Sequence, residues 1–457
     1  MNLSIIGTGY VGLVTGTCLA EIGHQVVCID NNQEKLEILK QNKSPIYELG
    51  LEDLIKQNTE LGRLSFSDNL KEAVINSDAI FLCLPTPANH DGTANLSFLF
   101  DVAGSIGKIL QTLPADGKTR VIINKSTAPV GISRMLTEKI RANSPVDISD
   151  RFEVVSNPEF LRQGTAVWDC LNPERIVIGA NSEFSKNLML DLYKPFESKN
   201  TPILVMDTAS SELTKYAANS FLALKISFAN ELSNLCEKLG ANIDLVTHGI
   251  ATDSRISPKF LNPGIGFGGS CFPKDVSAIH SIGIENDYSF QILEAVMQVN
   301  RDQRLHFVHK IKKLFGTDLS GKTFGVWGLA FKPGTDDVRD APSIDIIGEM
   351  ILLGAKIKAY GPEATANWKK FTNLDIETPA DHYEVAKDVD ALLILTEWDI
   401  FKASDLSKVK SLMKNPVILD GRNTFSLEEV SKADIYYESM GRQILKPRAN
   451  NSQSILI

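Results

Sequence analysis

Short apolar runs alternate with amphipathic segments along the first half of the chain. Segments with hydrophobic residues at three- and four-residue spacing separate the runs, and Gly, Pro, Asn or Asp residues stand at the junctions. This alternation is typical of a doubly wound α/β domain built on a mostly parallel sheet. The predicted strands cover residues 3–6, 26–29, 79–84, 121–124, 153–155 and 175–178, and a further short strand, 203–206, ends the domain.

A long amphipathic helix is predicted next, from Ser210 to about Leu239. Its apolar residues recur every three or four positions: Leu213, Ala217, Phe221, Leu224, Phe228, Leu232, Leu235 and Leu239. Gly240 is the expected C-terminal stop of this helix. A second helical stretch should follow the Gly/Pro-rich residues 262–273 and run towards Phe315. We interpret this central region as a helical connector.

Strand-like runs then return at residues 323–327, 356–360, 391–395 and 416–419. They indicate a second, smaller α/β domain. The sequence therefore predicts an α/β fold with two Rossmann-like, doubly wound domains joined by a long central helix. The expected divisions are 1–206, 207–312 and 313–457, and the polar tail from about Arg442 is expected to be poorly ordered.

Length, charge and hydropathy exclude several classes of protein. The 457 residues suit two or three domains, and the net charge of −9 has no long basic block within it. Nucleic acid is therefore not an expected partner. The apolar runs are too short to cross a bilayer. The N-terminus runs directly into the first predicted strand without a basic leader, so we expect a cytoplasmic protein without a membrane anchor.

Cysteine and histidine usage does not indicate a metal site. The six cysteines are scattered, with no Cys-x-x-Cys pair, which argues against a zinc ribbon and against a disulfide framework. His306 and His309 could share a helix face, but no third ligand is visible nearby and the stretch is rich in Lys and Arg. We interpret that stretch as a solvated surface and expect no metal.

A glycine-rich turn follows the first predicted strand and opens a helix over residues 13–22. It reads Gly7-Thr8-Gly9-Tyr10-Val11-Gly12, and its glycines allow a pyrophosphate to approach the helix N-terminus. Asp30 ends the second strand, where a carboxylate would bind ribose hydroxyls and disfavour a 2′-phosphate. This pattern predicts NAD rather than NADP. Lys35 either approaches the same end of the cofactor or is a solvated surface lysine.

A partial glycine signature, Gly325-Val326-Trp327-Gly328, follows a strand in the C-terminal domain. It lacks the full dinucleotide motif, so it predicts a nucleotide-handling site rather than a second NAD site.

The segment from Gly266 to Asp275 carries the most specific chemistry. Cys271 stands in a glycine loop and is followed by Phe-Pro-Lys-Asp and an apolar helical run, so it should lie near a helix N-terminus. The helix dipole and Lys274 would both favour the thiolate. A nucleophile is the favoured interpretation over a buried structural thiol, because a structural thiol rarely needs flanking glycines and adjacent charge.

Several motifs in one order make the chain resemble the UDP-glucose/GDP-mannose dehydrogenase family over nearly its whole length. Besides the glycine turn and the cysteine loop, they are Leu84-Pro85-Thr86-Pro87, Lys125-Ser126-Thr127, Asn157-Pro158-Glu159-Phe160-Leu161, Glu212-Leu213-Thr214-Lys215-Tyr216-Ala217-Ala218-Asn219, Phe331-Lys332-Pro333-Gly334-Thr335-Asp336-Asp337-Val338-Arg339 and Asp420-Gly421-Arg422.

The resemblance implies oxidation of a primary alcohol to an acid by removal of two hydrides, with two NAD molecules binding in turn. Cys271 would attack the intermediate aldehyde, and water activated by Glu159 would hydrolyse the resulting thioester. Lys215 and Asn219 are four residues apart on the predicted long helix and so share a face, where both could point at the reacting oxygen. Asp275 and Thr127 resemble the family's water-positioning and proton-relay groups.

The resemblance also assigns binding residues and domain roles. Residues 1–206 would bind NAD, 207–312 would carry the dimerisation region and the cysteine loop, and 313–457 would bind the UDP-sugar. The cofactor residues are Gly7, Gly9, Tyr10, Val11, Gly12, Asp30, Lys35, Thr86, Thr127, Gln163, Lys274 and Arg339. The substrate residues are Glu159, Phe160, Leu161, Arg162, Lys215, Asn219, Arg255, Phe260, Leu261, Asn262, Pro263, Gly264, Gly268, Lys332 and Arg422.

Two of these positions carry further implications. Arg255 matches an arginine that reaches the substrate of the neighbouring subunit, so the resemblance implies at least a homodimer. Gln163 departs from the family, which usually has a glutamate there on the cofactor side. The amide keeps an acceptor and removes a charge, so NAD affinity is expected to differ while the chemistry persists.

Alternative functions share most of this chemistry. Phe272 and residues 258–264 look more like the branch that converts UDP-glucose to UDP-glucuronate than like GDP-mannose dehydrogenases. UDP-N-acetylhexosamine dehydrogenases have a different cysteine neighbourhood. A non-enzymatic nucleotide-sugar sensor would be expected to lose Cys271, Lys215 or Glu159, and all three are present.

Overall fold

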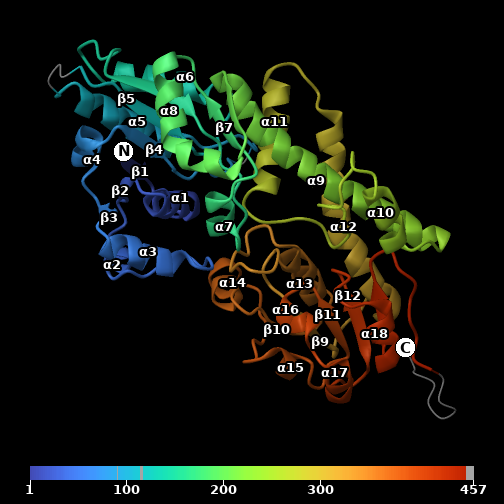
Figure 1. Ribbon diagram of the computed structural model, residues 1–457. Helices are drawn as coiled ribbons and strands as arrows, with labels where there is room; N and C mark the ends of the chain where they lie inside the picture. Colours follow the sequence, from blue (N-terminus) through green and yellow to red (C-terminus); the bar gives the residue numbers. More distant parts are fainter. Residues whose placement is uncertain (90, 114–116, 449–457) are drawn as a thin grey trace. The chain divides into compact units, whose positions relative to one another are not determined.

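The computed structural model describes residues 1–89, 91–113 and 117–448 (Figure 1). The chain folds as two compact units. The first consists of Met1–Ala218 with Ser277–Asn286, and the second of Asn219–Val276 with the chain from Asp287 onward. Each unit is built around its own sheet. Within the described part of the chain, no helix is long and apolar enough to cross a membrane.

The first unit contains an eight-stranded sheet in the order β3-β2-β1-β4-β5-β6-β7-β8. Neighbouring strands are parallel except β6 and β7, which are antiparallel. The strands are β1 (Asn2–Ile6), β2 (Gln25–Ile29), β3 (Leu64–Ser67), β4 (Ala79–Leu82), β5 (Arg120–Asn124), β6 (Phe152–Ser156), β7 (Ile176–Gly179) and β8 (Ile203–Met206). The predicted doubly wound domain is confirmed. Strand β3 was not predicted, because Leu-Ser-Phe-Ser gives only one short alternation.

Helices connect these strands. They are α1 (Tyr10–Glu21), α2 (Gln33–Lys40), α3 (Leu51–Glu60), α4 (Leu70–Asn76), α5 (Ser97–Leu110), α6 (Ile132–Ala142), α7 (Ala166–Leu171), α8 (Glu183–Tyr193) and the 3₁₀ helix η1 (Lys194–Lys199). Strand β1 pairs in parallel with β2 on one side and with β4 on the other, so the strand order reverses direction between β1 and β4. Ligands of open α/β sheets bind beyond the carboxyl ends of the strands at such a point.

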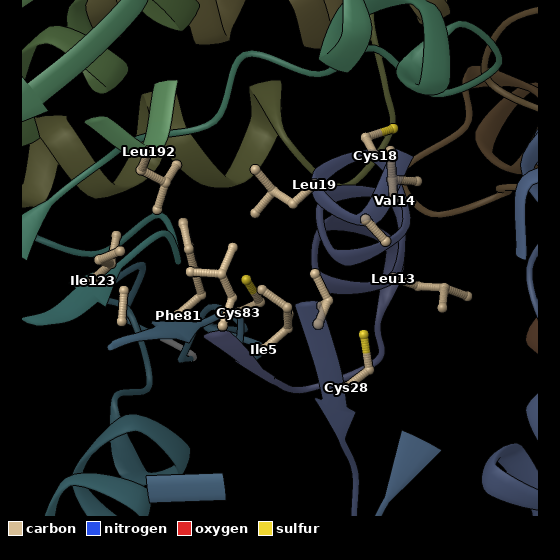
Figure 2. Close-up of a cluster of buried hydrophobic side chains, with 14 of the residues drawn as sticks. Ile5, Leu13, Val14, Cys18, Leu19, Cys28, Phe81, Cys83, Ile123 and Leu192 are labelled. Carbon is tan, nitrogen blue, oxygen red and sulfur yellow. The ribbon is translucent and has the colours of Figure 1, made fainter. Parts of the chain in front are cut away.

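The packing of helix α1 against the sheet explains two of its glycines. Leu13, Val14, Cys18 and Leu19 of this helix belong to a buried cluster that includes residues of β1, β2 and β4, and Figure 2 shows them together. A Cβ at Gly16 would lie 2.6 Å from Cys28 Sγ. At Gly12, it would lie 1.9 Å from the backbone oxygen of Gly7. Helix and turn approach so closely that side chains larger than hydrogen do not fit.

Helix α9 (Thr208–Leu239) confirms the predicted long helix, and Gly240 follows it with φ +70°. The division between the two units falls within this helix. The second helical stretch was predicted as one segment, but it consists of α11 (Phe272–Glu285) and α12 (Gln291–Phe315). Asp287, with φ +55°, lies between them, where a continuous right-handed helix is broken. Helix α10 (Ile243–Ala251) was not predicted.

The second unit contains a five-stranded parallel sheet in the order β10-β9-β11-β12-β13. The strands are β9 (Thr323–Trp327), β10 (Lys356–Tyr360), β11 (Ala391–Ile394), β12 (Val417–Asp420) and β13 (Tyr436–Ser439). Its helices are α13 (Pro342–Leu352), α14 (Thr365–Phe371), α15 (His382–Val385), α16 (Asp399–Lys402), α17 (Leu406–Leu412) and α18 (Leu427–Ala433). The predicted second α/β domain is confirmed, and β13 is an additional edge strand.

The expectation of a poorly ordered tail from Arg442 is wrong for residues 442–448. Leu445 exchanges two backbone hydrogen bonds with Tyr437, at 2.9 and 3.0 Å, and packs against a buried cluster. The Arg442 guanidinium donates to the backbone oxygen of Phe425 at 2.8 Å and to Asp244 at 3.1 Å. These contacts order a polar segment that composition alone would leave in solvent. Residues 449–457 lie outside the described residues.

The interpretation of the His306 region as a solvated surface holds for the exposed His309 but is wrong for His306 and Lys310. His306 Nε2 lies 3.1 Å from Glu237 Oε2, and the buried Lys310 Nζ donates to Glu237 Oε1 at 2.7 Å and to Glu438 Oε1 at 3.3 Å. Burial alone would raise the pKa of Glu237, but its hydrogen bond with His306 and the Lys310 charge lower that pKa to about 2. His306 and Lys310 of α12 are therefore paired with carboxylates of α9 and β13.

Candidate active site

The glycine turn and Asp30 are joined by hydrogen bonds at the carboxyl ends of β1 and β2. Gly7 has φ +97° and donates its N–H to the backbone oxygen of Ile29 at 2.8 Å. Asp30 Oδ2 accepts from the N–H of Thr8 at 2.8 Å and from its hydroxyl at 2.6 Å. Asp30 Oδ1 accepts from the N–H of Asn32 at 2.9 Å. The carboxylate that was predicted to face a ribose is therefore held against the turn that would carry the pyrophosphate.

The same contacts keep Asp30 ionised. Burial would raise the pKa of Asp30, but hydrogen bonds from Thr8 and Asn32 outweigh it and hold the pKa below its ordinary value. Lys35 Nζ lies 4.0 Å from Asp30 Oδ2. Of the two interpretations of Lys35, proximity to the predicted ribose end is thus favoured, although the side chain is partly exposed.

Two further cofactor candidates, Thr86 and Thr127, meet beyond β4 and β5. The hydroxyl of Thr86 donates to the backbone oxygen of Thr127 at 2.6 Å. Next to them, the Ser126 hydroxyl donates to the backbone oxygen of Leu84 at 2.9 Å and accepts from its N–H at 2.8 Å. The two sequence motifs are therefore hydrogen-bonded to each other after β4 and β5. Strand β4 is the neighbour of β1, which leads into the glycine turn.

Glu159 and Lys215 form a buried ion pair. Lys215 Nζ donates to Glu159 Oε1 at 2.8 Å, and the N–H of Leu161 donates to Oε2 at 2.6 Å. The ammonium also lies 5.4 Å from the centroid of the Phe160 ring. Burial would raise the pKa of Glu159, but the Lys215 charge and hydrogen bond, with the Leu161 N–H, lower it. The carboxylate is thus anionic at neutral pH and lies against the cation expected at the reacting oxygen.

Lys125 is a buried residue of this region to which the sequence assigned no role. Its Nζ donates to Asn157 Oδ1 at 3.0 Å, and the Tyr193 hydroxyl donates to the same oxygen at 2.5 Å. Burial lowers the pKa of Lys125, and the nearby Lys215 charge acts in the same direction. The Lys125-Ser126-Thr127 motif had marked this position, but only the folded chain shows that the lysine supports the turn before Glu159.

Arg162 and Gln163 continue the segment after Glu159. The Arg162 guanidinium pairs with Asp169, with Nη2 2.6 Å from Oδ1 and Nε 3.0 Å from Oδ2. The predicted substrate residue Arg162 is therefore half-exposed and held by a carboxylate of α7. Gln163 follows it directly, before the left-handed Gly164 with φ +85°.

In the second unit, Cys271 is the exposed cysteine and precedes the first residue of α11. The N–H of Asp275 donates to the Cys271 backbone oxygen at 2.8 Å, which forms the first helical bond. The predicted helix N-terminus is therefore confirmed. Lys274 Nζ lies 2.6 Å from Asp275 Oδ1, and the Asn219 side-chain amide donates to Asp275 Oδ2 at 2.6 Å. The charge of Lys274 is thus compensated by Asp275, and Asn219 contacts the residue expected to relay protons.

The glycine loop before Cys271 packs on the loop that contains Arg339. The N–H of Gly269 donates to the backbone oxygen of Arg339 at 2.9 Å. A Cβ at Gly268 would lie 2.1 Å from the backbone oxygen of Asp340. The Arg339 guanidinium pairs with Asp337 and interacts electrostatically with Cys271. These contacts bring the cofactor candidate Arg339 against the cysteine loop, which contains the substrate candidate Gly268.

Arg422 organises the loops of the second unit. Its guanidinium donates to the backbone oxygens of Gly266 at 3.2 Å, Leu395 at 3.0 Å and Phe331 at 3.1 Å. Burial lowers the pKa of Arg422. Phe331 precedes the substrate candidate Lys332, so this arginine joins the cysteine loop to the loop after β9.

The substrate candidates at 260–264 have different environments. Phe260 has φ +65°, Leu261, Pro263 and Gly264 are buried, and Asn262 is exposed. The N–H of Gly264 donates to Asn230 Oδ1 at 2.8 Å, and Gln303 donates to its backbone oxygen at 2.8 Å. Arg255 projects from the surface with its side chain 86% exposed and its guanidinium paired with Asp253.

Over residues 1–89, 91–113 and 117–448, no group of three or more His, Cys, Asp or Glu side chains is arranged to hold a metal ion.

Three segments of the chain match domains of one family. Residues 1–197 match the NAD binding domain of the UDP-glucose/GDP-mannose dehydrogenase family, residues 209–302 its central domain, and residues 325–427 its UDP binding domain. These matches cover the glycine turn, the cysteine loop and the loop that follows β9.

Relatives match nearly the full length of the chain. The UDP-glucose 6-dehydrogenase TuaD of Bacillus subtilis is 45% identical, over 97% of this chain and 94% of the relative. The UDP-glucose 6-dehydrogenase of Rhizobium meliloti is 42% identical, over 97% of this chain and 100% of the relative. The solved structure of a UDP-glucose dehydrogenase from Pyrobaculum islandicum is 35% identical, with a TM-score of 0.86 over 94% of this chain and 95% of that one.

The position of Asp30 generates a prediction about cofactor choice. NADP should support a rate roughly tenfold or more below that with NAD, because a 2′-phosphate would meet the ionised carboxylate. Replacement of Asp30 by Ser should narrow the gap, measured as the ratio of kcat/KM for the two cofactors. Asp78→Ser is the matched control, since Asp78 lies at the amino end of β4, whereas Asp30 follows the carboxyl end of β2, and the pKa of Asp78 is also lowered. Equal wild-type values with both cofactors would contradict the assignment.

Proposed function

The chain belongs to the UDP-glucose/GDP-mannose dehydrogenase family, and from this membership we propose that it oxidises UDP-glucose to UDP-glucuronate with NAD. The observation that supports this substrate most directly is the similarity, over nearly the whole chain, to relatives named UDP-glucose 6-dehydrogenase. The GDP-mannose dehydrogenase of Pseudomonas aeruginosa is less similar, at 28% identity and a TM-score of 0.54.

The proposed division of labour follows the three family segments. Residues 1–206 bind NAD, 207–312 carry the cysteine loop and the dimerisation region, and 313–457 bind the UDP-sugar. The matched segments 1–197, 209–302 and 325–427 support these assignments. Since NAD and UDP-glucose are soluble metabolites, the cytoplasm is the proposed location.

NAD, when bound, accepts one hydride in each of two oxidation steps. In the first, the sugar hydroxyl releases its proton to solvent by way of the proposed relay at Asp275, while Lys215 and Asn219, one helical turn apart on α9, stabilise the developing charge on the sugar oxygen. The thiolate of Cys271 then adds to the aldehyde carbon to form a thiohemiacetal. Loss of the second hydride converts this adduct to a thioester, so no free aldehyde leaves the enzyme.

Glu159 is the proposed base for hydrolysis. Its lowered pKa keeps the carboxylate anionic, but a carboxylate with a low pKa is a weak base. As Lys215 shifts its interaction to the reacting oxygen, it stabilises the Glu159 charge less, and the basicity of Glu159 rises. Water loses a proton to Glu159 and attacks the thioester carbon, and the Cys271 thiolate leaves as the acid forms.

The first test of this proposal is stoichiometry. Each UDP-glucose should yield two NADH and one UDP-glucuronate, because one cysteine retains the intermediate between the two oxidations. NADH absorbance and chromatography of the sugar nucleotide measure both, with GDP-mannose and UDP-N-acetylhexosamines tested in parallel. One NADH per sugar with a trappable aldehyde would refute the four-electron reaction, and faster oxidation of GDP-mannose would refute the proposed substrate.

A second test separates the roles of Cys271 and Glu159. Glu159→Gln should form the thioester but release it about 10²–10⁴-fold more slowly, because the amide does not accept the proton of water. Intact-protein mass spectrometry after mixing with UDP-glucose and NAD should then show an acyl adduct.

Two further variants control this experiment. The adduct should vanish when Cys271→Ala is added, and an adduct that persists would identify a different nucleophile. Glu153→Gln, on the strand before Glu159, removes a carboxylate bound to Ser182 and should release product like the wild type.

We also propose that the active form is at least a homodimer in which a second copy covers one face of α9. Phe221, Phe228 and Leu235 follow one another at seven-residue spacing on this helix, and their side chains are about half exposed. Exposed apolar residues in such a row are typical of a protein–protein interface. Arg255 would then contribute to the site of the neighbouring copy.

Replacement of Phe228 by Asp tests this assembly. A buried charge in the interface should shift the protein towards monomers and lower the specific activity at least about tenfold, because Arg255 no longer reaches a neighbour. Light scattering on the assayed sample gives the mass, and Leu352→Asp, an exposed apolar residue at the end of α13, is the control. A fully active wild-type monomer would exclude the proposed role of Arg255.

A further inference from the structure

Glu48 is a buried carboxylate to which neither the motifs nor the proposed mechanism assigns a role. It lies between α2 (Gln33–Lys40) and α3 (Leu51–Glu60) and is 7% exposed. Its position in the sequence is far from both the glycine turn and the segment that follows β6. In the folded unit it contacts both of them.

The carboxylate of Glu48 accepts three hydrogen bonds. Its Oε2 accepts from the Tyr10 hydroxyl and from the N–H of Gly164, the latter at 2.7 Å. Its Oε1 accepts from the N–H of Ala166 at 2.8 Å. The N–H of Gly164 also lies 3.2 Å from the Tyr10 hydroxyl oxygen, so phenol, carboxylate and peptide form a closed group.

The protonation state of Tyr10 suits this arrangement. Burial raises the pKa of Tyr10 well above its ordinary value, and the hydrogen bond and charge of Glu48 raise it further. The phenol therefore remains a donor at physiological pH. An anionic acceptor with three donors makes charge-assisted bonds that are stronger than those of a neutral amide.

The partners of Glu48 belong to two parts of the candidate site, the glycine turn and the segment that follows Glu159. Tyr10 stands between Gly9 and Val11, at the first residue of α1, so its ring is anchored to the cofactor turn. Gly164 is five residues after Glu159, whose Oε2 accepts from the N–H of Leu161 within the same segment. A shift of Gly164 would therefore reach the residues 159–163, which carry the proposed base and the cofactor candidate Gln163.

We propose that Glu48 is a positioning residue that fixes the cofactor turn against the segment 159–166. It acts through the Tyr10 hydroxyl on one side and through the N–H groups of Gly164 and Ala166 on the other. Loss of the carboxylate should weaken NAD binding by way of Tyr10 and slow the step assigned to Glu159 by way of Gly164. The second of these effects depends on the proposed function, whereas the first does not.

Glu48→Gln is the decisive variant because it keeps the size of the side chain. The amide retains one acceptor oxygen and turns its NH₂ group towards donors, so at least one of the three bonds is lost. The dissociation constant of NAD, measured by calorimetry without substrate, should rise about tenfold, the effect of one lost charge-assisted bond. Glu48→Asp should recover part of the affinity if its shorter carboxylate still reaches Tyr10.

A double-mutant cycle with Tyr10→Phe identifies the route of the effect. The NAD affinity of Glu48→Gln combined with Tyr10→Phe should be close to that of the weaker single variant, because both remove the same contact. Independent, additive losses would show that Glu48 does not act through Tyr10 and would overturn the proposal.

Glu212→Gln provides a control with matched chemistry. Glu212 is also buried in the first unit and accepts from two backbone N–H groups and one hydroxyl, those of Gly131 and Ser133. The Glu212→Gln variant should lose about as much thermal stability as Glu48→Gln but should keep the NAD affinity of the wild type. An equal loss of NAD affinity in Glu212→Gln would indicate general loosening of the unit and would contradict a specific role for Glu48.

A second readout tests the link to Glu159. During turnover with UDP-glucose, Glu48→Gln should accumulate part of the Cys271 acyl adduct at saturating NAD, whereas Tyr10→Phe should accumulate less. Absence of any adduct in Glu48→Gln, with the adduct present in Glu159→Gln, would overturn this half of the proposal. If wild-type enzyme produced no NADH from UDP-glucose, the proposed function would fail while the NAD-binding result for Glu48 would still stand.

Discussion

A carboxylate that leaves water loses several kcal/mol of solvation, and it is stable in the interior only where hydrogen-bond donors compensate for that loss. This constraint determines how the loops of the chain are held. Glu48 accepts from Tyr10, Gly164 and Ala166, and Glu159 accepts from Lys215 and Leu161. In the second unit, the fully buried Asp420 accepts from the N–H groups of Arg422 and Thr424 and from the Tyr437 hydroxyl. Each carboxylate is satisfied by groups from separate segments, so satisfying it also fixes those segments relative to one another within their unit.

The buried Glu159–Lys215 pair satisfies this constraint without adding much stability. A buried ion pair contributes little net stability, and well-packed apolar residues often replace one without loss. A further charged group adds to the desolvation penalty, since Lys125 is buried nearby and burial lowers its pKa. Two buried lysines around one carboxylate are an expensive arrangement for a structural purpose. The proposed mechanism would give them a purpose, because a site that stabilises negative charge on a substrate oxygen needs such preorganised cations.

Local patterns predicted much of this fold because strands and helices leave periodic signals. The bounds of β9 (Thr323–Trp327) and β10 (Lys356–Tyr360) agree with the predicted runs, and Gly240 ends α9 as expected. Elements that depend on tertiary contacts were missed. Strands β3 and β13 are short, and the order of residues 442–448 comes from partners such as Phe425 and Asp244. Nothing in the local sequence encodes those partners.

The same distinction applies to the candidate site. Cys271 at the start of α11 and Asp30 at the end of β2 could be predicted, because each follows from its own motif. The contacts of Glu48 could not, since its partners lie 38, 116 and 118 residues away.

The electrostatics of Cys271 also depend on contacts beyond its motif. The sequence places the Lys274 ammonium three residues away, but that charge lies 2.6 Å from Asp275 Oδ1 and is largely compensated. What remains is the start of α11, whose dipole favours an anion, and Arg339, which interacts electrostatically with the sulfur. Arg339 is itself paired with Asp337, so its charge is shared. A partly compensated field would suit the proposed role of Cys271 as first a nucleophile and then a leaving group, because strong stabilisation of the thiolate would aid its departure while lowering its nucleophilicity.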